Sequence, residues 1–292
     1  MAGLRAITIL IFFILLTILG IPLQWLALKL RLRARKRVPV FYHRLVCRLI
    51  GVRISVVGAP VKGGVLLAAN HSGWLDIPIL STIMPVSFIA KHEVAGWAFF
   101  GLLANLQETI FVRRGERAKT AHVRDKIRRR LLDGDALVMF PEGTSSDGNH
   151  VLSFKSALFG AAELPLSEDV AHHIRHAPVQ PVSIAYTRLH GIPMGRENRP
   201  FFAWYGDMEL VPHLLEAFER GPIDVVVELH KPLTIDEEGG RKPLAAAAEA
   251  MVRGGVVRAL SGTPAAHAPA IDHELIEAMG EDEAEEEAEE VA

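Results

Sequence analysis

The longest hydrophobic stretch of the chain lies at its amino end, where residues 6–28 are almost wholly apolar. As a helix, this stretch would extend about 34 Å, slightly more than the ~30 Å hydrocarbon core of a bilayer. It lacks an Ala-x-Ala-like cleavage signal and is long for a signal peptide, so we expect it to be retained. Gly20 and Pro22 leave two arrangements open: one kinked span, or two amphipathic helices lying in one leaflet.

Shorter apolar runs in the rest of the chain predict strands. We expect them at residues 53–57, 65–69, 87–90, 109–112, 136–140, 179–186 and 224–229. Residues 117–132 have helical spacing, with apolar side chains on one side and arginines largely on the others, and a further helix is expected at 156–164. The alternation of strands and helices predicts an α/β fold.

Three regions follow from these patterns. Residues 1–48 form a membrane anchor with a basic flank, residues 49–262 a globular domain, and residues 263–292 an Ala/Pro-rich linker with an acidic tail. The tail is predicted to be disordered, apart from a short helix at 274–279.

The formal net charge of −2 hides a strong asymmetry. From Ile271 onward there are 11 acidic residues and no Lys or Arg, which leaves 32 basic and 23 acidic residues elsewhere. Six of the basic residues directly follow the apolar stretch: Lys29, Arg31, Arg33, Arg35, Lys36 and Arg37. The positive-inside rule therefore predicts a globular domain on the cytoplasmic face of the inner membrane. Because the basic cluster adjoins an apolar helix, we expect membrane lipids as its partner and no nucleic acid.

Candidate chemistry begins where the apolar run 65–69 ends. His71 precedes Asp76 by five positions, so the carboxylate can accept from one imidazole nitrogen while the other takes a proton. No serine or cysteine nucleophile is obvious beside the pair, which favours a reaction in which a substrate hydroxyl is the nucleophile. A second run, 136–140, leads into Pro141 and Glu142, again a carboxylate at the end of a predicted strand.

These segments belong to four blocks that resemble the glycerolipid acyltransferase family, the 1-acylglycerol-3-phosphate acyltransferases and their relatives. The blocks are residues 70–76 (NHSGWLD), 110–115 (IFVRRG), 140–144 (FPEGT) and 179–183 (VQPVS). The resemblance covers roughly residues 50–235. It implies a glycerol-3-phosphate acyltransferase-like α/β fold, with a mixed central sheet flanked by helices and one or more amino-terminal membrane helices.

The resemblance also implies roles for single residues. His71 is the general base and Asp76 orients it. The residues linked to acceptor binding are Arg114, Glu142, Gly143, Thr144 and, for an anionic headgroup, Lys155. Pro181 is linked to donor binding or to the shape of the site.

The implied reaction moves a fatty acyl group from acyl-carrier protein or coenzyme A to the hydroxyl of a lysolipid, without a cofactor. The expected acceptor is 1-acylglycerol 3-phosphate. The second possible acceptor is lyso-ornithine lipid, because Ser145 stands where many phosphatidate-forming members have arginine, and residues 203–208 resemble the lyso-ornithine lipid enzymes. The pattern is also compatible with a thioesterase or with a non-catalytic lipid-binding or scaffold protein, although a scaffold needs no base with an orienting acid.

Two further groups are candidate sites. His172, His173 and His176 lack the His-Glu-x-x-His spacing, so no metal is expected there. The apolar, aromatic residues 91–101 and the pair Trp204 and Tyr205 are interpreted either as walls of the substrate site or as ordinary core and surface.

Overall fold

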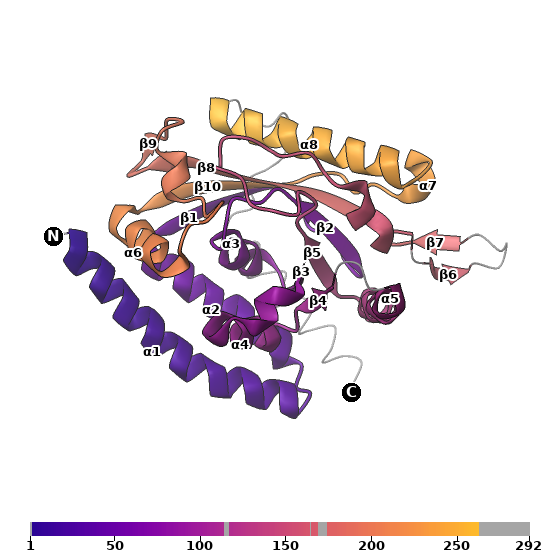
Figure 1. The fold of residues 1–292 in the computed structure, drawn as a ribbon, viewed down its shortest axis with the longest axis horizontal. Coiled ribbons are helices and arrows are strands. Elements are labelled where there is room, and N and C mark those ends of the chain that lie inside the picture. Colours follow the sequence, from indigo (N-terminus) through magenta and orange to yellow (C-terminus); the bar gives the residue numbers. More distant parts are fainter. Residues whose placement is uncertain (1, 114–116, 164, 169–173, 263–292) are drawn as a thin grey trace, which may run out of the picture.

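The computed structural model describes residues 2–113, 117–163, 165–168 and 174–262. An eight-stranded sheet forms its centre (Figure 1). Its strands are β1 (Val52–Val57), β2 (Val65–Ala69), β3 (Val86–Lys91), β4 (Ile110–Val112), β5 (Ala136–Met139), β8 (Val179–Leu189), β9 (Ile192–Pro193) and β10 (Ile223–Leu229). A separate hairpin pairs β6 (Pro165–Glu168) with β7 (Ile174–His176). The predicted α/β class is therefore confirmed.

The strand order determines where a site can form. The order is β1-β10-β8-β2-β5-β3-β4, with β9 paired to β8. Strands β8, β2, β5, β3 and β4 run parallel to one another, whereas β10 runs antiparallel to β8. The carboxyl ends of five strands consequently share one edge, and loops leaving that edge are the usual place for a site in an α/β protein.

Helices cover both faces of the sheet (Figure 1). They are α1 (Ala2–Lys29), α2 (Ala34–Ile50), α3 (Asp76–Ile83), α4 (Ala98–Leu106), α5 (Arg117–Leu132), α6 (Leu210–Arg220), α7 (Ile235–Glu238) and α8 (Arg241–Ser261), with the 3-10 turns η1 (His92–Gly96), η2 (Ser156–Ala161) and η3 (Arg199–Phe201). Alternate residues of β2 point to opposite faces. Val65 and Leu67 join a core with α1, α2, α3 and α6, whereas Leu66 joins one with α5, η2 and α8.

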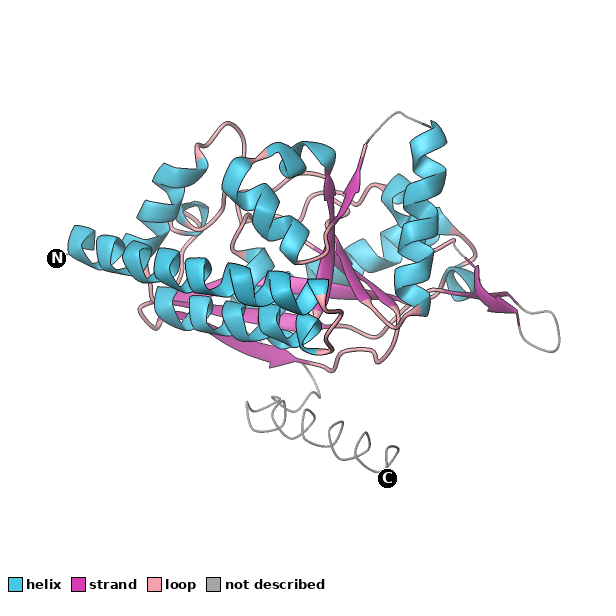
Figure 2. Cartoon of the chain, turned by 90° about the horizontal axis from the view of Figure 1, so that it is seen from below, coloured by secondary structure: helices cyan, strands magenta, loops and turns pink. Residues whose placement is uncertain are grey.

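Helix α1 is continuous through Pro22, so the division into two helices at Gly20 and Pro22 is not observed. It is long and apolar enough to cross a membrane, yet it lies beside α2 under the sheet (Figure 2). One side of α1 is buried in the protein, and the other exposes large apolar side chains. These exposed residues, called here the outer face of α1, are Leu4, Ile7, Ile11, Phe12, Ile14, Leu15, Ile18, Leu19, Leu23, Trp25 and Leu26.

The predicted strands all occur; residues 65–69 match β2 at both ends, and the other ends coincide or differ by at most three residues. The helix expected at 156–164 is instead the shorter 3-10 turn η2. Helices α2, α3, α4, α6, α7 and α8 and the short strands β6, β7 and β9 were not predicted. The predicted region limits stay predictions, and α1 and α2 contribute to the same core as the sheet. Residues 263–292, including the helix expected at 274–279, lie outside the described residues.

Candidate active site

His71 lies just beyond β2, at the edge where the parallel strands end. The register that pairs Ala68 of β2 with Met139 of β5 brings the loops after both strands together. Asn70 fixes the end of β2 to β8, because its Nδ2 donates to the Ile184 carbonyl (2.9 Å) and its Oδ1 accepts from the Ile184 amide (2.8 Å). The strand edge thus gives the histidine a fixed backbone position.

Asp76 is fully buried and accepts four hydrogen bonds. Its Oδ2 accepts from His71 Nδ1 (2.8 Å), Ser72 N (2.7 Å) and Gly73 N (3.0 Å), and its Oδ1 accepts from the Tyr186 hydroxyl (2.7 Å). The pKa of Tyr186 is raised well above its ordinary value, mainly by burial and also by the Asp76 carboxylate. The Tyr186 hydroxyl therefore keeps its proton and remains a donor. This environment keeps a proton on His71 Nδ1 and leaves Nε2 as the basic nitrogen.

The His71 ring is partly open to solvent, with 20% of its side chain exposed. One face stacks on Phe140, with ring centroids 3.9 Å apart and planes inclined by 17°. Among the described residues, none hydrogen-bonds Nε2. An oriented imidazole with a free, accessible nitrogen can remove a proton from a bound hydroxyl.

Glu142 is tied to the same backbone. Its Oε1 accepts from the His71 amide (2.9 Å) and its Oε2 from the Leu152 amide (3.2 Å), while only 1% of the residue is exposed. Burial raises the pKa of Glu142 to about 8, against the two amides, which favour the charged form. In the structure this carboxyl positions the histidine backbone. Its predicted contact with the acceptor stays a prediction.

Two further loops pack against the segment from His71 to Asp76. The amide of Ser146 donates to the His71 carbonyl and that of Trp204 to the Ser72 carbonyl, both at 2.8 Å. Gly73 permits this approach, because a Cβ there would lie 2.8 Å from the Trp204 nitrogen. Ser145 Oγ donates to the Trp204 carbonyl (2.5 Å). The roles of Tyr186 and of the Trp204 and Ser146 backbones were not predicted from the sequence.

The other predicted residues occupy varied positions. Gly143 turns the chain with a φ of +71° and is half-buried, and Thr144 is exposed. Lys155 is exposed and precedes η2. Pro181 is buried inside β8 and pairs with Ala68 of β2. Arg114 lies outside the described residues.

The aromatic segment and the histidine group have defined surroundings. Residues 91–101 form the end of β3, η1 and the start of α4. Trp97 of this segment contacts Trp204 edge-to-face, with ring centroids 5.7 Å apart, so it borders the loop that packs on Ser72. His176 Nδ1 contacts Asp236 Oδ1 at 2.8 Å, and His172 and His173 lie outside the described residues. The part of the chain that the structure describes holds no cluster of three or more potential metal ligands.

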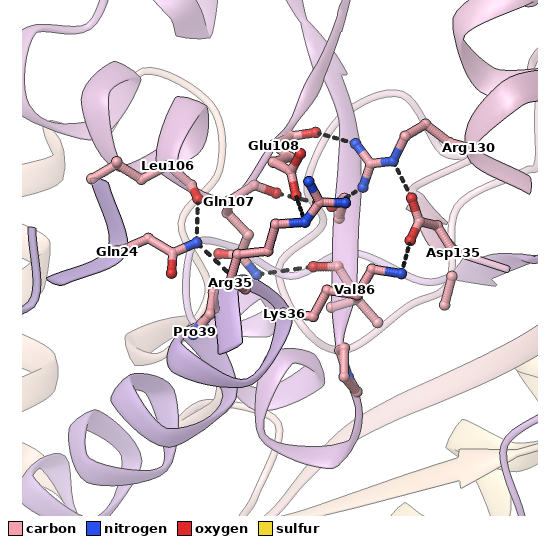
Figure 3. A pocket seen from close by; sticks show the side chains of 13 residues that line it. Gln24, Arg35, Lys36, Pro39, Val86, Leu106, Gln107, Glu108, Arg130 and Asp135 are labelled. Carbon is pink, nitrogen blue, oxygen red and sulfur yellow. Dashed lines mark hydrogen bonds and ion pairs between the residues drawn. The ribbon is translucent and has the colours of Figure 1, made fainter. Parts of the chain in front are cut away.

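A small polar cavity of about 30 Å³ lies at the opposite edge of the sheet (Figure 3). It lies by the first residues of β3 and β5, where Lys36 Nζ is 2.7 Å from Asp135 Oδ1 and Arg130 also pairs with Asp135. Burial alone would raise the pKa of Asp135, but these two cations lower it overall. A space of this size holds about one water molecule. The cluster therefore joins α2 and α5 to the start of β5, at the edge of the sheet opposite His71.

The sequence is similar to those of known acyltransferases. The family profile described as Acyltransferase matches residues 53–185. The chain is 49% identical over 243 residues to the lyso-ornithine lipid O-acyltransferase of Brucella abortus (strain 2308), covering 83% of this chain and 90% of that protein. It is 36% identical over 113 residues to the 1-acyl-sn-glycerol-3-phosphate acyltransferase of Neisseria gonorrhoeae, covering 39% and 44%.

The fold is similar to the crystal structure of the 1-acyl-sn-glycerophosphate (LPA) acyltransferase PlsC from Thermotoga maritima. The TM-score is 0.61 at 21% sequence identity, and the match covers 91% of this chain and 100% of that one. The predicted arrangement of a mixed sheet flanked by helices is confirmed.

Proposed function

The chain belongs to the glycerolipid acyltransferase family, and we propose that it acylates the free hydroxyl of lyso-ornithine lipid. It is an O-acyltransferase that acts on a lysolipid. The choice of headgroup rests on the similarity to the Brucella abortus enzyme, which covers 83% of this chain and 90% of that protein. This acceptor replaces the 1-acylglycerol 3-phosphate that was expected from the sequence.

The proposed mechanism uses His71 Nε2 as the base. It removes the proton of the lysolipid hydroxyl as that oxygen attacks the thioester carbonyl. The new C–O bond forms, the C–S bond breaks when the tetrahedral intermediate collapses, and the imidazolium returns the proton to the leaving thiolate. Asp76 stabilises the imidazolium through Nδ1. The acyl-carrier protein or coenzyme A thioester is a substrate, and the reaction needs no cofactor.

Ser145 supports the choice of headgroup. Its hydroxyl donates to the Trp204 carbonyl, so it holds the loop that covers Ser72 and contributes no charge. An arginine at this position would supply a bidentate phosphate partner. A headgroup without phosphate does not need one.

The remaining binding roles are proposals too. We assign the acceptor to Arg114, Gly143, Thr144 and Lys155, and the shape of the donor site to Pro181. Of these, Lys155 offers the simplest test, because it is exposed. Lys155→Ala is expected to raise the KM for the acceptor about threefold to tenfold and to leave the KM for the donor unchanged. An unchanged acceptor KM would remove Lys155 from the site.

Membrane association fits the asymmetry of α1. Its inner side is held by the protein, while its outer face is apolar along the whole helix. We propose that α1 lies in one leaflet with this face among the acyl chains, at the cytoplasmic surface of the inner membrane. Trp25, with Lys29 4.7 Å above its ring, would lie at the boundary between the acyl chains and the headgroups.

One experiment separates the acceptors. The purified, detergent-solubilised protein is given each donor, acyl-carrier protein or coenzyme A thioester, with lyso-ornithine lipid or with 1-acylglycerol 3-phosphate, and His71→Ala is the control. Faster, His71-dependent turnover of lyso-ornithine lipid is expected. Preference for 1-acylglycerol 3-phosphate, the acceptor named for the Neisseria gonorrhoeae relative, would overturn the headgroup and keep the mechanism.

A further inference from the structure

Trp74 stands inside the catalytic loop, between His71 and Asp76, but the proposed mechanism does not use it. Its indole Nε1 donates to His213 Nδ1 of α6, 3.0 Å away. The same ring packs edge-to-face on Phe218 of α6, with centroids 6.2 Å apart. Two side chains of a distant helix therefore hold the middle of the loop that carries the base and its orienting acid.

His213 is built as an acceptor for this indole. The residue is 4% exposed, and burial lowers the pKa of its imidazole, although a hydrogen bond with the Ala203 backbone and the charge of Glu216 act in the other direction. The ring is accordingly neutral near pH 7, and because Nδ1 accepts, the proton resides on Nε2. That nitrogen is buried as well. A leucine in this space would leave the indole N–H of Trp74 without its acceptor.

Phe218 connects the same contact to α1. Its ring lies 6.3 Å from that of Phe13 on the inner side of α1. Arg5 of α1 donates to the Phe218 carbonyl and, at 2.8 Å, to the Ile50 carbonyl at the end of α2. The helix whose outer face is apolar thus holds α6 by its inner side, and α6 holds Trp74.

We propose that His213 and Phe218 are positioning residues for the catalytic loop, which they hold through Trp74, and that α1 is a structural part of this support. The turn from His71 to Asp76 has to place a nitrogen within hydrogen-bond distance of the acceptor hydroxyl, and misplacement by about 1 Å can slow catalysis 100-fold. The proposal rests on acyl transfer and not on the choice of headgroup.

A double-mutant cycle tests the link between Trp74 and His213. His213→Leu and Trp74→Phe are each expected to lower kcat about tenfold, with KM values for donor and acceptor within twofold of wild type. The double variant should lose no more than either single variant. His213→Asn, whose side-chain oxygen can replace Nδ1 as acceptor, should recover most of kcat.

These measurements use the full chain in detergent, and thermal unfolding verifies that each variant is folded. Additive losses, a change confined to KM, or equal losses in His213→Asn and His213→Leu would each overturn the positioning role. Trp74→Phe and His213→Asn change the packing least, so they keep the test valid if His213→Leu does not fold.

The contribution of α1 has a matched pair of variants in neighbouring residues. Phe13 packs on Phe218, whereas Phe12 is 56% exposed on the outer face. In detergent, Phe13→Ala is expected to lower kcat at least threefold more than Phe12→Ala, about the effect of one lost aromatic contact. On vesicles of anionic phospholipid, Phe12→Ala should weaken binding more than Phe13→Ala. Equal kcat values for the two variants in detergent would exclude α1 from the support.

Discussion

Two histidines of this protein lie beside a carboxylate and a hydroxyl, at opposite faces of strand β8. His71 contacts Asp76, which also accepts from the Tyr186 hydroxyl. His230, which follows β10, has Nε2 2.6 Å from Ser183 Oγ and Nδ1 3.4 Å from Glu228 Oε1. By residue types alone, the second group resembles a hydrolase triad more closely than the first does.

The direction of the hydrogen bonds distinguishes them. Ser183 Oγ donates to the Val252 carbonyl of α8 (2.9 Å), so it accepts from His230 Nε2, and that nitrogen cannot act as a base toward the serine. At His71 the proton is held on Nδ1 and Nε2 is open. Glu228 is also engaged elsewhere, 2.7 Å from Arg258 of α8.

Access distinguishes them as well. Helix α8 covers the His230 group at Gly255, where even a Cβ would lie 2.2 Å from Ser183 Oγ. No substrate atom fits in such a space. An accessible nitrogen on a fixed loop suits His71 to the proposed role of base, whereas the same residue types packed under a helix are closed to a substrate.

The largest expected difference between the two groups is in catalysis. His71→Ala should lower kcat about 1,000-fold, because the proposed general base is lost, and should unfold at nearly the wild-type temperature. His230→Gln should keep kcat within about twofold. Initial rates with saturating lysolipid and donor measure both, and a comparable loss in the two variants would show that the comparison is wrong.

Asp76→Asn is expected to lower kcat about 100-fold or more. The amide group cannot accept all four hydrogen bonds, so the imidazole loses its fixed tautomer. Tyr186→Phe removes one of the four donors and should lower kcat only about fivefold. Steady-state kinetics of the two variants, with circular dichroism as the control for folding, order these effects. A larger loss in Tyr186→Phe would contradict the assigned roles.

The parts of the site that depend on local sequence patterns could be predicted from the sequence. The continuous apolar runs of β2 and β5 identify strands buried on both faces, and the motifs that follow them supply His71, Asp76 and Glu142. Because both strands are parallel neighbours, their loops meet. These residues could be identified without knowing the rest of the fold.

The partners that come from distant segments could not be predicted in this way. Tyr186 reaches Asp76 only because β8 lies next to β2, a pairing that no local pattern reports. Helix α2 was missed because arginines and Pro39 interrupt its apolar positions. Helix α8 was missed because its alanines and glycines give no clear apolar side, and its close packing on Ser183 depends on those small residues.

Two neighbouring glycines of α8, Gly254 and Gly255, have different surroundings. Gly255→Ala should destabilise the protein by about 2 kcal/mol, because the new methyl group overlaps Ser183 Oγ and lies 2.8 Å from the His230 ring. Gly254→Ala meets only the flexible end of Arg258 and should stabilise the protein by up to about 1 kcal/mol through helix propensity. Chemical denaturation measures both. Equal effects would mean that α8 does not seal the His230 group.

The smallest expected effect concerns the pH dependence of stability. Burial lowers the pKa of His230, with Arg258 acting in the same direction and Glu228 against it. The folded state therefore disfavours the charged ring: the stability that the neutral ring contributes is complete above the ordinary histidine pKa of about 6.5 and is lost as the pH falls below it. His230→Gln keeps a donor toward Ser183 and does not titrate, so its free energy of unfolding should fall less steeply than that of wild type between pH 7 and pH 5. Other groups titrate in both proteins and cancel in the difference. If the free energies of unfolding of wild type and His230→Gln fell equally steeply, His230 would be protonated equally easily in the folded and unfolded chains. That result would contradict the claim that His230, unlike His71, is sealed from solvent.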